Sequence, residues 1–168
     1  MGLFLLAAVT VSSGCSILFP DASAPKSGAY SVTPPGDPWK SIPVGERTDS
    51  IDALKADVAY EDTRSGAIIS LNSLCRKYTN ASLDELSRNL VLGIKDKQVL
   101  SERDFELSGA PAKDTVIQGE VENAKVQIRT VVLKKNFCTY DLIFVASPER
   151  VQISEKYFDE FIKSFKVE

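Results

Sequence analysis

The feature that most constrains the fold is a run of strand-like segments in the second half of the chain, joined by short polar links. These segments are rich in apolar and β-branched residues, and they cover residues 99–107, 116–121, 126–133 and 137–146. A break at Gly109-Ala110-Pro111 precedes the second segment, and Lys134-Lys135-Asn136 forms a turn before the last. Because antiparallel neighbours can be joined by tight turns, these links predict an antiparallel meander.

Two further strands are expected earlier in the chain. Residues 56–61 alternate, and residues 67–72 are rich in branched side chains, with Ser65-Gly66 as a plausible turn between them. Trp39 lies between prolines and charged residues at the start of this region. We expect Trp39 to fill a place in the core rather than to form a ligand platform.

Two helices are expected. Ser82 and Glu85 fit a capping box, in which each side chain bonds the other residue's backbone N–H, and this predicts a helix over about 83–96. Its apolar stripe consists of Leu83, Leu86, Leu90 and Ile94. A second helix is expected from Ser147 as N-cap and Pro148 as first residue. Its stripe of Phe158, Phe161, Ile162 and Phe165 predicts a buried face.

The order of these elements predicts a single α+β domain over residues 38–168, with an antiparallel sheet of about six strands and two amphipathic helices packed on it. Four features carry a resemblance to the PsbP/Mog-like α/β/α sandwich domains: Pro38-Trp39, Ile69-Ser70-Leu71-Asn72, the Leu-rich first helix and the Phe158–Phe165 helix. Members of that group mostly act by binding proteins, so the resemblance implies a binding module rather than a reaction.

The chain also resembles small uncharacterised lipoproteins of deltaproteobacterial-type genomes. The shared segments are Leu74-Cys75-Arg76-Lys77-Tyr78, Tyr140-Asp141-Leu142 and Ala146-Ser147-Pro148-Glu149-Arg150.

The N-terminus resembles a bacterial lipoprotein signal. A nine-residue uncharged apolar run, Leu3–Val11, is too short to span a bilayer and is followed by Ser12-Ser13-Gly14 and then Cys15. The resemblance implies a lipid on Cys15, removal of residues 1–14, and a cell-envelope location. Ser16 after the Cys favours the outer membrane, facing the periplasm. The alternative is a buried N-terminal strand or helix with a chance Cys.

Residues 15–37 are expected to be the lipidated Cys and a flexible tether, because the segment is rich in Pro, Ala, Ser and Gly. Tyr30-Ser31-Val32 could form a short edge strand within it.

Cys75 and Cys138 would be the remaining thiols in an oxidising compartment, which predicts a disulfide between them. The alternative is two buried free thiols. A bridge would bring the basic pairs Arg76-Lys77 and Lys134-Lys135 together as a patch for phosphate head groups or an acidic partner. The simpler interpretation, which we favour, is that these charges keep the sheet edges soluble.

Composition argues against most catalytic chemistry. The chain of 168 residues contains no His, which excludes Ser-His-Asp and Cys-His sites and removes the commonest metal ligand. The acidic pairs Asp84-Glu85 and Asp159-Glu160 lie on predicted helices, where adjacent residues diverge, and Glu61-Asp62 lies at an expected turn. A net charge of −3 gives no electrostatic signature of nucleic-acid binding.

The sequence therefore predicts a non-enzymatic envelope lipoprotein, without a metal or cofactor, that binds a protein partner. The alternative is a lipoprotein that binds a small ligand or a lipid.

Overall fold

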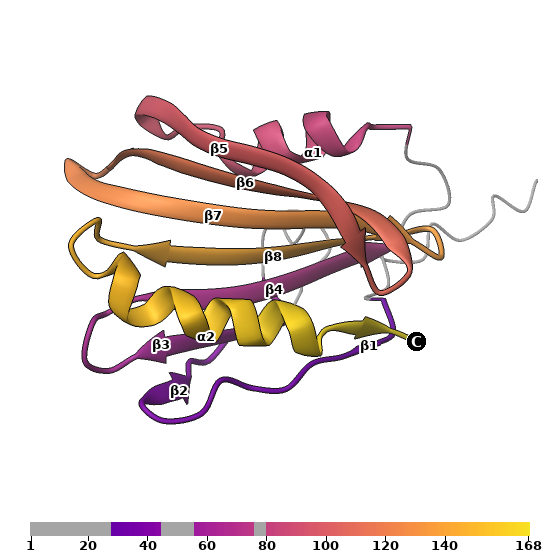
Figure 1. Cartoon of the computed structure of the whole chain (residues 1–168), viewed down its shortest axis with the longest axis horizontal. Helices are drawn as coiled ribbons and strands as arrows, with labels where there is room; N and C mark the ends of the chain where they lie inside the picture. The colour runs from indigo at the N-terminus through magenta and orange to yellow at the C-terminus, as the bar shows by residue number, and fades with distance from the viewer. Residues whose placement is uncertain (1–27, 45–55, 76–79) are drawn as a thin grey trace, which may run out of the picture.

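The structure is a computed structural model that describes residues 28–44, 56–75 and 80–168. Its centre is a seven-stranded antiparallel sheet in the order β2-β3-β4-β8-β7-β6-β5. The strands are β2 (Trp39–Ser41), β3 (Val58–Asp62), β4 (Ile68–Cys75), β5 (Lys95–Leu107), β6 (Ala110–Val121), β7 (Ala124–Lys135) and β8 (Cys138–Ala146). Helix α2 (Val151–Ser164) lies on one face and α1 (Leu83–Leu90) on the other (Figure 1). The α+β class is confirmed, with seven strands in place of about six.

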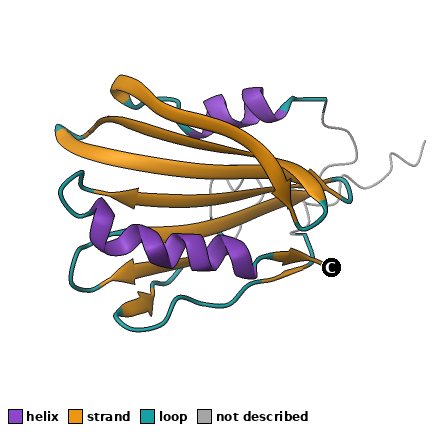
Figure 2. Cartoon of the chain, viewed as in Figure 1, coloured by secondary structure: helices purple, strands orange, loops and turns teal. Residues whose placement is uncertain are grey.

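Strands β5 to β8 form the expected antiparallel meander, which Figure 2 shows as the broad upper part of the sheet. The break expected at residues 109–111 is wrong, because the turn contains only Ser108 and Gly109 and β6 begins at Ala110. Pro111 is the second residue of β6. It lies one residue before the β6–β7 ladder, which begins at Ala112. Its missing N–H therefore removes no bond from that ladder.

The first helix begins as predicted but ends earlier. Ser82 Oγ accepts a hydrogen bond from Glu85 N (3.2 Å), and Ser82 N donates to Glu85 Oε2 (2.8 Å), which completes the capping box. The helix ends at Leu90 rather than near residue 96, because Gly93, with φ of 85°, turns the chain into β5.

The second helix begins later than predicted. Its first residue is Val151 and its N-cap is Arg150. Ser147 and Pro148 belong to a preceding turn, in which Arg150 N donates to Ser147 O (2.9 Å). The Pro148 ring is compatible with this turn, so the local pattern did not distinguish a turn from the first turn of a helix.

The main core lies between α2 and the sheet. The four residues of the predicted α2 stripe are between 0% and 6% exposed: Phe158, Phe161, Ile162 and Phe165. Trp39 is 5% exposed and its ring packs against Tyr157 at 5.8 Å, as expected of a core residue. A smaller cluster of Val91, Ile117 and Ile128 lies on the α1 side.

A two-stranded sheet joins the first and last described segments. Strand β1 (Tyr30–Ser31) pairs antiparallel with β9 (Lys166–Val167). The Tyr30 ring contacts Phe165 at 5.9 Å and Tyr140 at 6.2 Å. The short strand expected at 30–32 is therefore present, and its partner lies more than a hundred residues away.

No described helix combines the length and the apolar character that a membrane span requires.

Candidate functional site: the disulfide end of the sheet

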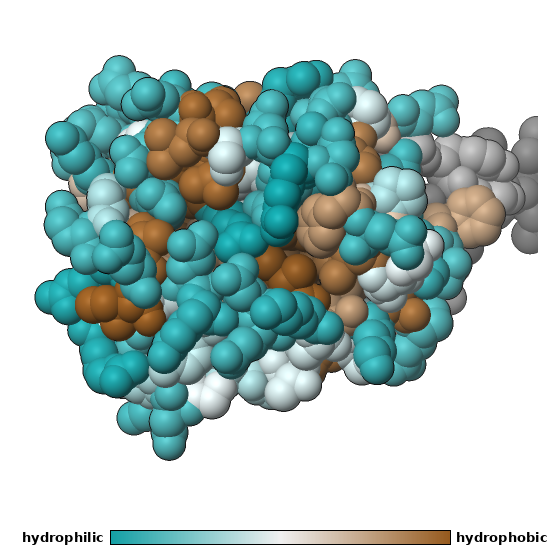
Figure 3. All heavy atoms as spheres, in the orientation of Figure 1, coloured by the Kyte–Doolittle hydropathy of each residue, from teal (hydrophilic) through white to brown (hydrophobic). Residues whose placement is uncertain are grey.

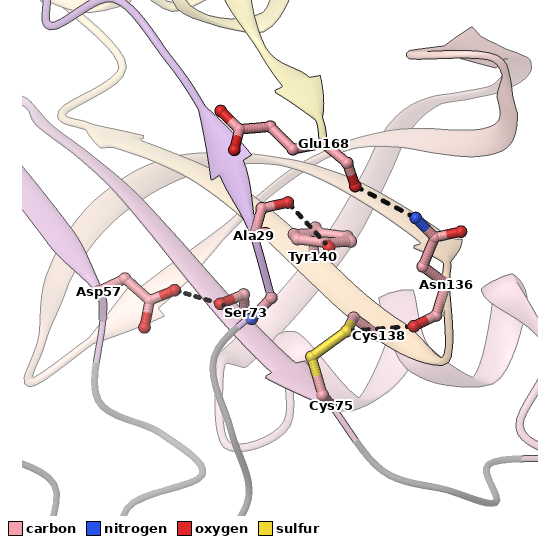
Figure 4. The surroundings of a disulfide bond; sticks show 9 residues. Ala29, Asp57, Ser73, Cys75, Asn136, Cys138, Tyr140 and Glu168 are labelled. Carbon is pink, nitrogen blue, oxygen red and sulfur yellow. Dashed lines mark hydrogen bonds between the residues drawn. A yellow bond between two sulfur atoms is a disulfide. The ribbon is translucent and has the colours of Figure 1, made fainter.

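Cys75 and Cys138 form a disulfide at one end of the central sheet (Figure 4). Cys75 is the last residue of β4 and Cys138 is the first of β8, and the two residues lie directly opposite each other in the ladder. Their Cα atoms are 3.9 Å apart. The predicted bridge is thus present, and it links neighbouring strands rather than distant parts of the fold.

The chain enters the described fold beside this disulfide. Gly28 N donates to Ser73 Oγ (2.9 Å), and Ser73 Oγ in turn donates to the Asp57 carboxylate. A Cβ at residue 28 would lie 2.7 Å from the Tyr140 ring, so only glycine fits there. Together these contacts hold the start of β1 against the sheet.

The hydroxyl of Ser73 is part of this attachment and not a nucleophile. Ser73 is fully buried, with its proton directed to Asp57 and its oxygen occupied by Gly28 N–H. Burial, and then the charge of Asp57, raises the pKa of the nearby Tyr140 hydroxyl above its ordinary value, which makes its ionised form still less accessible. These groups can hold a strand, but they offer no activated group to a substrate.

The β7–β8 turn lies at the same end. Asn136 Nδ2 donates to Glu168 O (3.2 Å), and Glu168 N donates to Ala29 O (3.2 Å). Cys138 Sγ lies 3.4 Å from Asn136 O. The first described residues, the last residues and this turn therefore form one contiguous surface.

The residues of the basic patch that the sequence offered as an alternative are only partly described. Arg76 and Lys77 lie outside the described residues, as does Cys15. Lys134 Nζ donates to Ala81 O (2.8 Å), and Lys135 Nζ donates to Ser108 O (2.6 Å). Because Lys134 and Lys135 are consecutive in a strand, they point to opposite faces of the sheet. Lys134 contacts the segment just before α1, and Lys135 contacts the β5–β6 turn.

On the α2 face, the buried charges form one network centred on Arg129 of β7. Its guanidinium lies 2.9 Å from Asp114 Oδ2 on β6, 2.8 Å from Asp159 and 3.2 Å from Glu155, both on α2. Burial alone would lower the pKa of Arg129, but Asp114 and then Asp159 more than offset burial and raise it. The network therefore ties α2 to the middle of the sheet.

Lys113, the residue before Asp114, ties the other helix, α1, to the opposite face of the sheet. Lys113 is 8% exposed, and its ammonium lies 2.8 Å from Asp84 of α1 and 3.2 Å from Asp104 of β5. Asp84, and then Asp104, raise the pKa of Lys113 despite its burial, and the bond to Lys113 lowers the pKa of Asp84. Two consecutive residues of β6 thus each fasten one helix to the sheet.

Asp141 of β8 is a buried carboxyl without such compensation. Burial raises its pKa to about 6, only partly opposed by a hydrogen bond from Asn72. Its Oδ1 atom has no hydrogen-bond partner. Perturbed carboxyls of this kind mark functional sites in some proteins.

No described cluster of three or more carboxylates or Cys residues is arranged to bind a metal ion.

Two hollows in the described surface are lined mainly by polar residues. One, of about 560 Å³, lies beside α1 and is lined by Asn80, Ala81, Glu85, Arg88 and Asn89. The other, of about 310 Å³, lies at the end of the sheet opposite the disulfide and includes Gln98, Gln118 and Lys125 in its lining. Pockets for small organic ligands are mostly apolar and enclose their ligand, and neither hollow has that character.

Comparison with known proteins identifies the fold. No protein-family model matches the chain, and no curated protein matches it in sequence. The cyanobacterial PsbP protein CyanoP of Synechocystis sp. PCC 6803 has a similar structure with a TM-score of 0.58 and 12% identity, over 95% of this chain and 99% of CyanoP. The fold is PsbP-like.

Two other solved structures share this PsbP-like fold. LpqN of Mycobacterium tuberculosis, which is involved in cell envelope biogenesis, aligns with a TM-score of 0.55 and 14% identity, over 83% of this chain and 84% of LpqN. PA94 of Pseudomonas aeruginosa, a protein of unknown function, aligns with a TM-score of 0.52 and 14% identity, over 86% of this chain and 85% of PA94. Identities this low establish likeness of fold alone.

The sequence pattern missed the residues that attach β1 to the sheet: Gly28, Asp57 and Ser73. Their contacts join segments 16 and 45 residues apart, which no local periodicity reveals. The one available signal was Gly28, a glycine two residues before a short strand-like segment.

Proposed function

We propose that this protein is a lipid-anchored accessory protein of the bacterial cell envelope that binds a protein partner and has no catalytic site. The lipid would be attached to Cys15, and Ser16 favours the outer membrane. LpqN, which shares the fold, is involved in cell envelope biogenesis, and this is compatible with an envelope role.

The observation that carries the binding role is the long edge strand β5. It has 13 residues, it lies at the edge of the seven-stranded sheet, and no described strand pairs with its outer side. Val99 is 53% exposed and Leu100 is 45% exposed. Figure 3 shows apolar surface near this upper edge of the sheet, over β5 and β6.

An exposed strand edge offers backbone N–H and C=O groups to a partner strand, and exposed apolar side chains add contact area. Bulges between Lys95 and Gln98 and between Val99 and Ser101 interrupt the inner ladder of β5. Such irregularities limit indiscriminate pairing of edges, so a partner must match this particular strand.

The buried charges support a binding role over catalysis. Arg129, Asp114 and Lys113 are all engaged in fastening helices to the sheet. A small-ligand role has less support, because the two hollows named above in the described surface are lined mainly by polar residues.

A site-specific photocrosslinker tests the partner. We expect a crosslinker at residue 99 to yield one reproducible adduct with an envelope protein in intact cells. The matched control is residue 153, since Ile153 is 47% exposed on α2, away from the edge. Equal adducts at both positions, or none at residue 99, would contradict binding through β5.

Cell fractionation of a Cys15→Ala variant tests the anchor separately. We expect the variant to leave the membrane fraction or to remain unprocessed. Normal processing with unchanged membrane retention would overturn the lipid assignment.

A further inference from the structure

The turn between β7 and β8 carries an exposed aromatic ring at the disulfide end of the molecule. Phe137 is 79% exposed, which makes it the most exposed large apolar side chain in the described part of the chain. It follows Asn136, which bonds Glu168 O, whereas Phe137 itself lies on the outer side of the turn and adds nothing to the core.

The backbone makes this choice of residue costly. Three two-residue turns join β5 to β8, and both residues of each turn have positive φ, as in the turns that suit antiparallel hairpins. The second residue is Gly109 in the first turn, Asn123 in the next and Phe137, with φ of 62°, in the last. Glycine and asparagine adopt this conformation readily, whereas a bulky side chain is strained there. Strain of this kind is often retained for function.

The ring lies close to the point where the chain enters the described fold. Asn136 contacts Glu168, which contacts Ala29, and Figure 1 shows the β7–β8 turn and the start of β1 at the same end of the molecule. Cys15 lies 13 positions before Gly28 in the chain. Fully extended, this stretch would span at most about 45 Å, so an anchor at Cys15 would keep this end near the bilayer.

We infer that the β7–β8 turn is a membrane-contacting tip whose Phe137 ring inserts among the lipid head groups and orients the anchored domain. This inference rests on the proposed lipid anchor. A convex tip with one protruding ring suits a deformable lipid surface, since protein partners of aromatic anchors must supply a shaped pocket. Phe, like Trp and Leu, is among the apolar side chains that surface-bound proteins bury at the boundary between head groups and acyl chains.

The charges at this end give the contact only modest help. The exposed Lys166 can approach lipid phosphates, but Lys135 is half-buried and bonds Ser108 O, and Glu106 and Glu168 carry negative charge at the same end. We therefore expect the apolar ring to supply most of the contact. A single ring would bind a membrane weakly by itself, but the anchor raises its effective concentration at the surface.

Fluorescence quenching tests the inference on the full chain. Because Cys75 and Cys138 are bridged, the remaining thiol, Cys15, can be coupled to a maleimide lipid in vesicles. This coupling replaces natural lipidation, so the test stands even if Cys15 is not lipidated in the cell. A Phe137→Trp variant then reports on the tip, and Trp39, the native tryptophan, supplies a constant buried background.

In vesicles with brominated acyl chains, we expect emission from residue 137 to be quenched and to lie at shorter wavelength than in solution. An Ile153→Trp variant is the control, because Ile153 is exposed near the N-terminus of α2, at the opposite end of the sheet. Absence of quenching at residue 137, or equal quenching at both positions, would overturn the inference. Lack of quenching together with a shift on adding the crosslinked partner would assign the tip to a protein contact instead.

Discussion

Arg129 on β7 and Asp114 on β6 lie side by side under α2, with Arg129 Nη2 2.9 Å from Asp114 Oδ2. The Arg129 side chain is 8% exposed and that of Asp114 is 4% exposed. A buried pair of this kind contributes little against a well-packed apolar pair, but removing one partner leaves the other charge uncompensated.

We therefore expect Arg129→Met to lower the free energy of unfolding by about 3 kcal/mol, because Asp114, Asp159 and Glu155 lose their shared cation. Urea denaturation followed by circular dichroism measures this. Arg103→Met is the matched control: Arg103 also contacts Asp114, but its side chain is 62% exposed. Its loss should cost about 1 kcal/mol or less. If the two variants lost the same free energy of unfolding, the burial of Arg129 would not explain its contribution to stability.

The raised pKa of Asp141 makes stability depend on pH. The pKa is about 6 in the folded protein against an ordinary value of 3.8, so the folded state keeps a proton that the unfolded chain has lost between these values. Asp141 therefore makes stability fall as pH rises from about 4 to about 6, by up to about 3 kcal/mol.

Asp141→Asn should remove this dependence and stabilise the protein by about 2 kcal/mol at pH 7, with little effect near pH 3. Thermal unfolding across this pH range provides the comparison. A variant that is destabilised at pH 7 but not near pH 3 would instead indicate that Asp141 is ionised and well compensated in the native state.

The disulfide closes a loop with a sequence separation of 63 residues. Removing that constraint from the unfolded chain should cost about 4 kcal/mol of stability in the chain-entropy model. The Cys75→Ala/Cys138→Ala double variant is expected to unfold at correspondingly lower denaturant concentration. Adding a reductant to the wild type should give the same shift, and the double variant should be insensitive to it. A reductant-insensitive wild type would mean that the bridge does not form.

The strained turn residue predicts a gain in stability. Phe137→Gly should raise the free energy of unfolding by about 1 kcal/mol, because glycine accepts a φ of 62° without steric cost. The converse change, Asn123→Phe in the equivalent position of the preceding turn, should lower it by a similar amount. Calorimetry of the two variants provides the test. Destabilisation by Phe137→Gly would instead imply that the ring has a structural role.

The parts of the fold that were predictable from sequence are those determined by local periodicity. Ser82 and Glu85 form the expected capping box, and Phe158 and Phe161 form the expected buried stripe. The end of α1 was harder to predict from sequence. Ile94 continues the helical spacing of apolar residues, although Gly93 has already turned the chain.

The candidate site was predictable only in its disulfide. Lys113 and Asp114 look like ordinary surface charges in the sequence, and their burial follows from contacts far along the chain. Lys113 lies against Asp84 of α1, and Asp114 lies against Arg129, which also binds α2. The pairing of β1 with β9 likewise depends on bringing together the two ends of the described chain, which no local pattern records.

That pairing has a mechanical consequence. If the chain ahead of Gly28 leads to an anchor, any force between the anchor and the domain enters through β1. The Gly28–Ser73 hydrogen bond and the antiparallel β1–β9 ladder take up the load first. Since β1 runs from this end back along the domain, the load acts along the strand, and β1 must slide past β9 rather than peel from it one bond at a time (Figure 1). The pairing of β9 with β1 would thus bear the force in shear before it reached the hydrophobic core.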